Sequence, residues 1–117
     1  MQLSEVKYPE GLPVDGYGPG FFRLAGQVQE GPMTVFAGKV GCWQGWTDTG
    51  WLDEARGAID LLLLGTGAEM LPVDKTLRSE VEAAGIALEQ MPTPSACRTY
   101  NVLLAEGRRV GLAAFPV

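Results

Sequence analysis

The sequence predicts one α/β domain with an antiparallel extension on its N-terminal side and about three helices. Residues 21–43 are rich in aromatic and β-branched residues and are interrupted by tight turns, a pattern typical of antiparallel strands. The strand predicted over residues 59–64 ends in the run Leu61–Leu64, which shows no polar alternation. Such a run is typical of a central parallel strand that is covered on both faces. A length of 117 residues fits a single domain.

The N-terminal stretch is predicted to be an arm that leads into the domain. Prolines and glycines interrupt residues 1–20 too often for regular structure. We therefore assign residues 1–14 to an N-terminal arm and residues 15–117 to the domain.

The region after the arm is predicted to be a β-meander. Phe22, Leu24 and Val28 share one parity and are predicted to face the same side. After the turn at Gly31-Pro32, the apolar positions of the next strands are Met33, Val35, Ala37, Val40 and Cys42.

The remaining two-thirds of the chain is predicted to alternate helix and strand. The elements are a short helix from Asp48 or Thr49 to about Arg56, the strand 59–64, a helix over 74–84, a strand Ile86–Glu89, a helix from Thr93-Pro94 to Glu106 and a strand Val110–Phe115. Thr93 is predicted to cap the last helix, with proline at its first helical position. That helix is predicted to bury Ala96, Tyr100, Leu103 and Leu104.

The charge and cysteine content argue against several classes of function. Nine basic and fourteen acidic residues give a net charge of −5, and the densest basic stretch is Arg108-Arg109. Nucleic acid and anionic membrane surfaces are therefore not predicted as partners. Cys42 and Cys97 do not form a disulfide framework, and Leu61–Leu64 is too short to span a bilayer. With no apolar stretch at the N-terminus to act as a signal, we expect a cytoplasmic protein without membrane insertion.

The chain contains no histidine, which removes the usual general base and a common metal ligand. Two separated cysteines cannot form a structural zinc site, and the acidic residues are scattered over the predicted helices. We therefore predict no catalytic residue, metal or cofactor.

One candidate ligand site lies where the predicted central strand ends. Gly65-Thr66-Gly67 follows that strand, at the end where open α/β sheets bind ligands. The start of the helix after Thr93 carries Cys97 and Arg98. The positive charge of Arg98 and the free backbone N–H groups at the helix start suit an anion. The alternatives are a tight glycine turn, a surface arginine and a thiol buried in the core.

A second candidate site is the tryptophan-rich segment after the meander. Trp43, Trp46 and Trp51 are large aromatic residues within nine positions of sequence. They could line a pocket or contact a protein partner, because tryptophan is enriched at interface hot spots. They could equally fill the space between strands and helices, and we expect at least one to belong to the core.

A series of short segments in a fixed order also suggests a family. The segments are Tyr17-Gly18, Phe21-Phe22, Ile59–Gly67, Gly85-Ile86, Glu89, Met91–Thr93, Ala96–Leu104 and Glu106–Arg108. The series resembles domain of unknown function 498 over about residues 15–116. This resemblance implies a compact three-layer α/β domain with a mixed central sheet, without an established activity or cofactor.

The resemblance also bears on function. Mitochondrial members of that family act in assembling respiratory complex I by protein–protein contact. This sequence departs from them in lacking a transit segment, and a shared fold does not carry function. The leading hypothesis is a non-enzymatic interaction or assembly module, either monomer or homodimer, that contacts a protein through the tryptophans. The alternative is a small-molecule or anion-binding protein, conceivably an enzyme, with its cleft between Gly65–Gly67 and Arg98.

Overall fold

A five-stranded mixed sheet forms the centre of the protein, in the order β5-β4-β8-β6-β7. The computed structural model describes residues 11–117, so most of the predicted arm lies outside the described residues. The strands of this sheet are β4 (Met33–Phe36), β5 (Lys39–Cys42), β6 (Leu61–Thr66), β7 (Ala87–Met91) and β8 (Val110–Phe115). Strand β6 runs parallel to β7 and β8, whereas β4 is antiparallel to β5 and β8.

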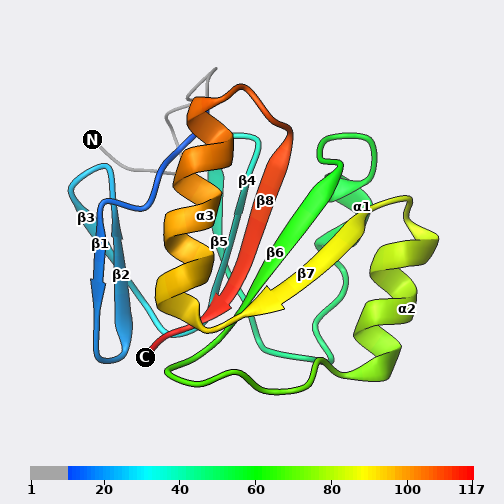
Figure 1. Ribbon diagram of the computed structural model, residues 1–117, viewed down its shortest axis with the longest axis horizontal. Helices are drawn as coiled ribbons and strands as arrows, with labels where there is room; N and C mark the ends of the chain where they lie inside the picture. Colours follow the sequence, from blue (N-terminus) through cyan, green and yellow to red (C-terminus); the bar gives the residue numbers. More distant parts are fainter. Residues whose placement is uncertain (1–10) are drawn as a thin grey trace.

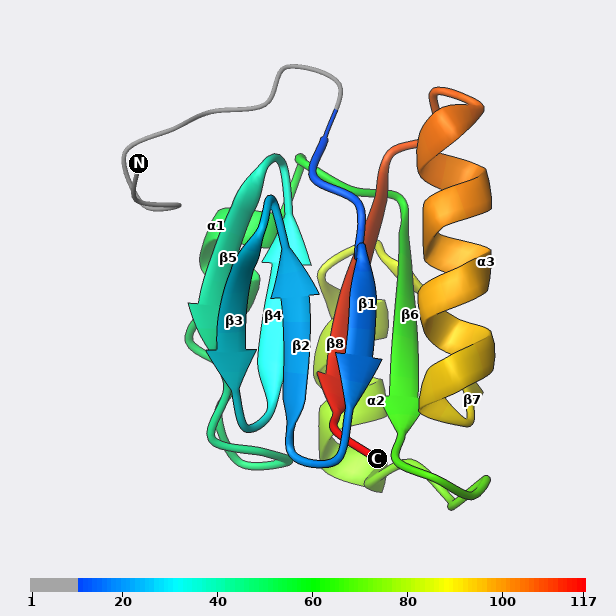
Figure 2. The ribbon, with the colours of Figure 1, turned by 90° about the vertical axis from the view of Figure 1, so that its left-hand side faces the viewer.

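Helices cover both faces of this sheet, which gives three layers (Figures 1 and 2). Helix α3 (Thr93–Ala105) lies on one face, called the α3 face below. Helices α1 (Leu52–Ala55) and α2 (Lys75–Ala83) lie on the other, called the α1/α2 face. The connection β6-α2-β7 joins neighbouring parallel strands, and β7-α3-β8 returns across β6 on the opposite face. The predicted three-layer α/β fold with a mixed sheet and three helices is therefore confirmed.

The predicted meander is divided between two sheets. Strands β1 (Gly16–Gly18), β2 (Phe21–Leu24) and β3 (Gln27–Glu30) form a separate antiparallel sheet on the α3 face, beside α3 (Figure 2). Only β4 and β5 join the central sheet. Strand β1 corrects the expectation that residues up to 20 lack regular structure. Its glycine-rich backbone is held extended because it pairs in register with β2.

Two Ala-Gly hairpin turns explain why the predicted faces of the meander were partly wrong. Ala25-Gly26 and Ala37-Gly38 both have positive φ angles, of 50° and 76° in the first turn and 51° and 76° in the second. Such two-residue turns set the register of the strands that they join. Val28 consequently pairs with Arg23 on the outer face and is 55% exposed, while Phe22 and Leu24 are buried.

The second turn accounts for Ala37, whereas Cys42 pairs with Met33 in register and is exposed at the end of the edge strand β5. Ala37 is an exposed turn residue rather than a strand residue. Met33 and Val35 are buried as predicted.

The last part of the predicted arm is packed into the domain. Leu12 and Val14 are 2% and 5% exposed and belong to the core beneath α3. The Tyr100 hydroxyl donates a hydrogen bond of 2.7 Å to the Leu12 carbonyl. The Asn101 side chain accepts from the Val14 N–H at 2.9 Å and donates to the Val14 carbonyl at 2.8 Å. The boundary predicted between residues 14 and 15 therefore lies too late, because residues 12 and 14 are core residues.

The observed helix ends match the predicted ends where a side chain next to the helix caps it. Asp74 caps α2 through a hydrogen bond from the Leu77 N–H, 3.1 Å long, as its position predicts. Helix α1 begins at Leu52, later than predicted, because Asp48 and its neighbours form a loop instead. Helix α3 starts at Thr93 with Pro92 at the cap position, and no side chain caps it. Leu103 and Leu104 on α3 are half-buried.

Candidate functional site

The predicted ligand turn at the carboxyl end of β6 is closed by hydrogen bonds within the protein. Gly65, Thr66 and Gly67 are all buried. The Gly67 N–H donates to Thr93 Oγ1 at 2.8 Å, and the Thr93 hydroxyl donates to the Phe115 carbonyl at 2.6 Å. The Thr66 hydroxyl donates to the Glu69 carbonyl at 2.6 Å. The Gly67 N–H, a donor that an anion could have used, is thus already taken.

Gly65 has a packing role in addition to the tight glycine turn that the sequence suggested. A Cβ atom at this position would lie 2.7 Å from Thr93 Oγ1 and 3.1 Å from the Thr93 Cα atom. Glycine therefore lets the start of α3 approach β6 closely. Thr93 is 0% exposed and joins β6, β8 and α3 at this point.

The two other predicted ligand residues, Cys97 and Arg98, differ in exposure although they are adjacent in α3. Cys97 is 3% exposed and packs in the core beneath α3. Burial raises the pKa of its thiol to about 11, so the protonated thiol is the dominant form at neutral pH. Arg98 is exposed, and no hydrogen bond or ion pair to its side chain is found within residues 11–117. The structure therefore brings the start of α3 to Gly65 but leaves Arg98 in solvent.

The three predicted tryptophans lie in one loop, residues 43–51, which we call the aromatic loop. Its conformation is held by Asp48, whose carbonyl accepts from the indole N–H groups of Trp43 at 3.1 Å and Trp51 at 2.7 Å. The Asp48 carboxylate accepts from the Gln44 N–H at 3.0 Å. Asp48 therefore closes the loop rather than capping α1, which explains the late start of that helix.

Aromatic contacts tie this loop to the end of β8. The Trp43 ring lies 4.8 Å from the ring of Phe115, and Trp46 lies 5.0 Å from the same ring, measured between centroids. Trp51 packs against Phe36 on β4, with centroids 6.1 Å apart. The loop therefore covers part of the α1/α2 face, where α1 is only four residues long.

The three tryptophans differ in exposure. Trp43 is 1% exposed, so it is a core residue, as we expected for at least one of them, and it is not part of a contact surface. Trp46 and Trp51 are half-buried. Trp46 differs further because its indole N–H has no hydrogen-bond partner in the part of the chain that the structure describes. Trp46 thus presents both apolar ring surface and an unused donor.

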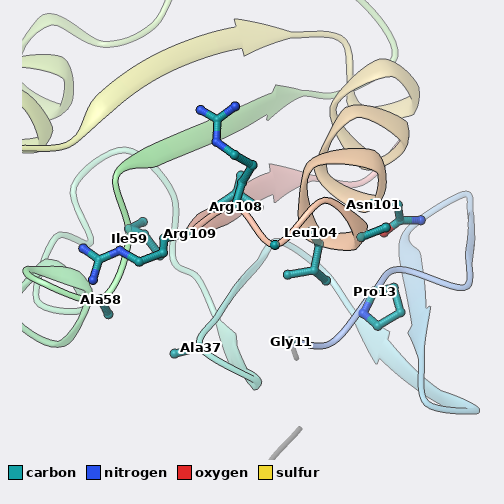
Figure 3. A pocket seen from close by; sticks show the side chains of 12 residues that line it. Gly11, Pro13, Ala37, Ala58, Ile59, Asn101, Leu104, Arg108 and Arg109 are labelled. Atoms are coloured by element: carbon teal, nitrogen blue, oxygen red, sulfur yellow. The ribbon is translucent and has the colours of Figure 1, made fainter. Parts of the chain in front are cut away.

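A cavity lies at the opposite end of the sheet, and the sequence did not indicate it. Its volume is about 710 Å³, and it is found where the end of α3 meets the segments that precede β6 and β8. Leu104, Ala58 and Ile59 contribute apolar side chains, and Arg108 and Arg109 lie at the start of β8 (Figure 3). The lining residues come from segments far apart in the chain, so no local pattern could have found them.

Residues 11–117 contain neither a membrane-spanning helix nor a cluster of metal ligands. Within residues 11–117, no helix combines the length and the hydrophobicity that crossing a bilayer requires. The same residues hold no group of three or more metal-ligating side chains.

The protein is a small three-layer α/β domain with a mixed sheet. Hydrogen bonds within the protein close the turn at the carboxyl end of β6. The chain belongs to the family described as protein of unknown function (DUF498/DUF598), which it matches over residues 14–115. The family resemblance seen in the sequence is therefore confirmed.

Three other proteins are similar to this chain over nearly all of its length. An uncharacterized protein of Rhodobacter capsulatus is 48% identical over 117 residues, which cover 100% of this chain and 94% of that protein. NADH dehydrogenase (ubiquinone) 1 alpha subcomplex assembly factor 3 of Mus musculus is 30% identical over 99% of this chain. This chain spans 66% of the length of the mouse protein. The crystal structure of an outer membrane protein from Bartonella henselae superposes with a TM-score of 0.81 at 34% identity, covering 94% of this chain and 98% of that one.

Proposed function

We propose that this protein is an interaction module that helps to assemble a respiratory NADH dehydrogenase and performs no chemistry of its own. Its similarity to the mammalian assembly factor, 30% in mouse and 31% in human over 99% of this chain, supports the assembly role. Protein contact is the mode of action that such a role requires. The cytoplasmic location, the absence of a cofactor and the oligomeric state remain predictions.

The observation that carries this proposal is the surface around Trp46. Its ring is half-buried against Phe115, so its orientation is fixed before any partner binds. Its indole N–H is unpaired within the described residues, whereas the indoles of Trp43 and Trp51 both donate to Asp48. A preoriented tryptophan with a free donor suits a protein interface, because it offers apolar contact area and one directional hydrogen bond. Trp51 and Phe115 supply half-buried apolar surface on the same face.

The test is recovery of NADH dehydrogenase subunits with the tagged protein from its native organism, measured by quantitative mass spectrometry. We expect Trp46→Ala to reduce that recovery by at least about tenfold, as removal of a hot-spot side chain does. The matched control is Val28→Ala, which truncates an apolar side chain that is 55% exposed on the outer face of the β1–β3 sheet. Val28→Ala should leave recovery unchanged.

Two outcomes would contradict the proposal. If no NADH dehydrogenase subunit is recovered with the unaltered protein, the assembly role is wrong. If subunits are recovered equally with Trp46→Ala and Val28→Ala, the contact does not involve the aromatic loop. A melting temperature measured on each purified variant shows whether the loss of recovery reflects unfolding.

A further inference from the structure

We infer that the cavity at the end of α3 is a binding site for a small organic anion with an apolar body. The site is independent of the aromatic loop, because it lies at the other end of the sheet. Its volume of about 710 Å³ falls within the range of about 300–1,000 Å³ that is usual for small-molecule sites.

Part of the cavity wall is apolar. Ile59 and Val110, both 3% exposed, lie at its inner side, and Leu104 and Ala58 are half-buried around it. Asn101 also lines the cavity, but its amide is already bonded to both backbone groups of Val14. Among residues 11–117, the lining therefore combines apolar and polar surface, and the side-chain amide of Asn101 is already paired.

The charge of the lining selects an anion. The chain has a net charge of −5, yet among residues 11–117 the cavity is lined by two arginines and by no acidic side chain. Arg109 is held by Asp60 through hydrogen bonds of 2.9 and 3.2 Å. Arg108 has no side-chain partner within residues 11–117 and remains available. Figure 3 shows that the two side chains leave the start of β8 in different directions, so Arg108 is not blocked by the Asp60–Arg109 pair.

The cavity also fits this ligand class better than the turn at the carboxyl end of β6. At that turn, the Gly67 N–H and the Thr93 hydroxyl bond to each other and to the end of β8. At the cavity, Arg108 is an exposed lining residue whose side chain has no partner within residues 11–117. Because arginine can donate two parallel hydrogen bonds to a carboxylate, the anionic group is placed at Arg108 and the apolar body against Leu104.

The test uses octanoate and its neutral counterpart octanamide as probes in ¹⁵N NMR titrations of the full chain at pH 7. We expect saturable shifts of the Ala58, Ala105 and Gly107 amides with both probes. Octanoate should bind about fivefold more tightly than octanamide, the ratio expected from one exposed charge interaction. A ring-shaped pair, 2-naphthoate and 2-naphthamide, tests whether the body is a chain or a ring.

Substitutions distinguish binding at this cavity from a general effect of the charge of the protein. Arg108→Ala should remove the preference for octanoate and keep octanamide binding, and Arg108→Glu should reverse the preference. Arg98→Ala is the matched control, because Arg98 is an exposed arginine on α3 with no side-chain partner within residues 11–117, and it is not among the residues that line the cavity. Ala105→Trp fills the cavity from an exposed helix position and should block both probes.

The result that overturns the proposal is the absence of saturable shifts around the cavity with every probe. Equal affinity for the charged and neutral probes would also overturn it, as would a preference that is lost in Arg98→Ala and kept in Arg108→Ala. None of these results bears on recovery of NADH dehydrogenase subunits, so the two proposals fail separately.

Discussion

The two faces of the central sheet are covered in different ways. On the α3 face, a helix of 13 residues and a three-stranded sheet lie over the strands. On the α1/α2 face, the cover consists of helices of four and nine residues and the aromatic loop. Long-range hydrogen bonds from Thr93, Tyr100 and Asn101 fasten the α3 face, at sequence separations of 22 to 88 residues. The loop on the other face is fastened mainly by its own residue Asp48.

This difference indicates a division of roles between the faces. Within residues 11–117, the buried polar side chains of the α3 face are all paired inside the protein. On the α1/α2 face, Trp46 keeps ring surface and one donor accessible. The packing beneath α3 therefore supplies stability, while the capacity to bind lies in the aromatic loop on the α1/α2 face and in the cavity at the end of α3. Substitutions on each face test that division.

The largest effect should come from the contrast between two tryptophans of one loop. Trp43→Ala removes a ring that is 1% exposed and should lower the free energy of unfolding by about 3–5 kcal/mol. Trp46→Ala removes a half-buried ring and should cost less than about 2 kcal/mol, since part of its surface already faces water. Urea unfolding at pH 7 measures both values. Equal losses would show that Trp46 is as much a core residue as Trp43.

The second effect concerns the buried thiol of Cys97. Burial raises its pKa to about 11, above the ordinary value of 9.0, so the folded protein binds this proton more tightly than the unfolded chain does. The associated stability is fully present below pH 9 and is lost as the pH rises through about 11, a fall of roughly 2–3 kcal/mol. Cys97→Ala should flatten this part of the stability curve, measured by urea unfolding between pH 8 and about 11.

A labelling experiment checks the same burial without titration. A thiol reagent at pH 8 should modify the exposed Cys42 rapidly and Cys97 only as fast as the protein opens. The variant Cys42→Ser isolates the signal of Cys97. Rapid labelling of that variant would show that the α3 face opens more readily than its hydrogen bonds suggest.

The smallest effect should come from a single hydroxyl on the α3 face. Tyr100→Phe removes the hydrogen bond of 2.7 Å to the Leu12 carbonyl and leaves that buried carbonyl unpaired. We expect a loss of about 1–2 kcal/mol in the free energy of unfolding. Tyr17→Phe is the control, because Tyr17 is 40% exposed and its hydroxyl has no partner within residues 11–117. A similar loss in both variants would contradict the claim that residues 11–14 are fastened by Tyr100.

The sequence by itself determined the elements whose signal is local. The apolar run Leu61–Leu64 identified the central strand, because a strand buried on both faces cannot alternate with polar residues. Asp74 marked the start of α2 correctly, since its carboxylate bonds an N–H only three residues away. The absence of histidine and the net charge likewise required no structure.

The hydrogen bonds and the burial of the predicted site residues depend on the tertiary structure. Thr93 reads as a helix cap in sequence, yet its hydroxyl bonds Gly67 and Phe115, which lie 26 and 22 positions away. Trp43 and Trp46 are equivalent by pattern and both pack against Phe115, yet within the described residues only Trp43 donates to Asp48 and is buried. The cavity beside Arg108 arises where separate segments meet. Its existence depends on how the layers pack, and no spacing along the chain encodes a volume left between them.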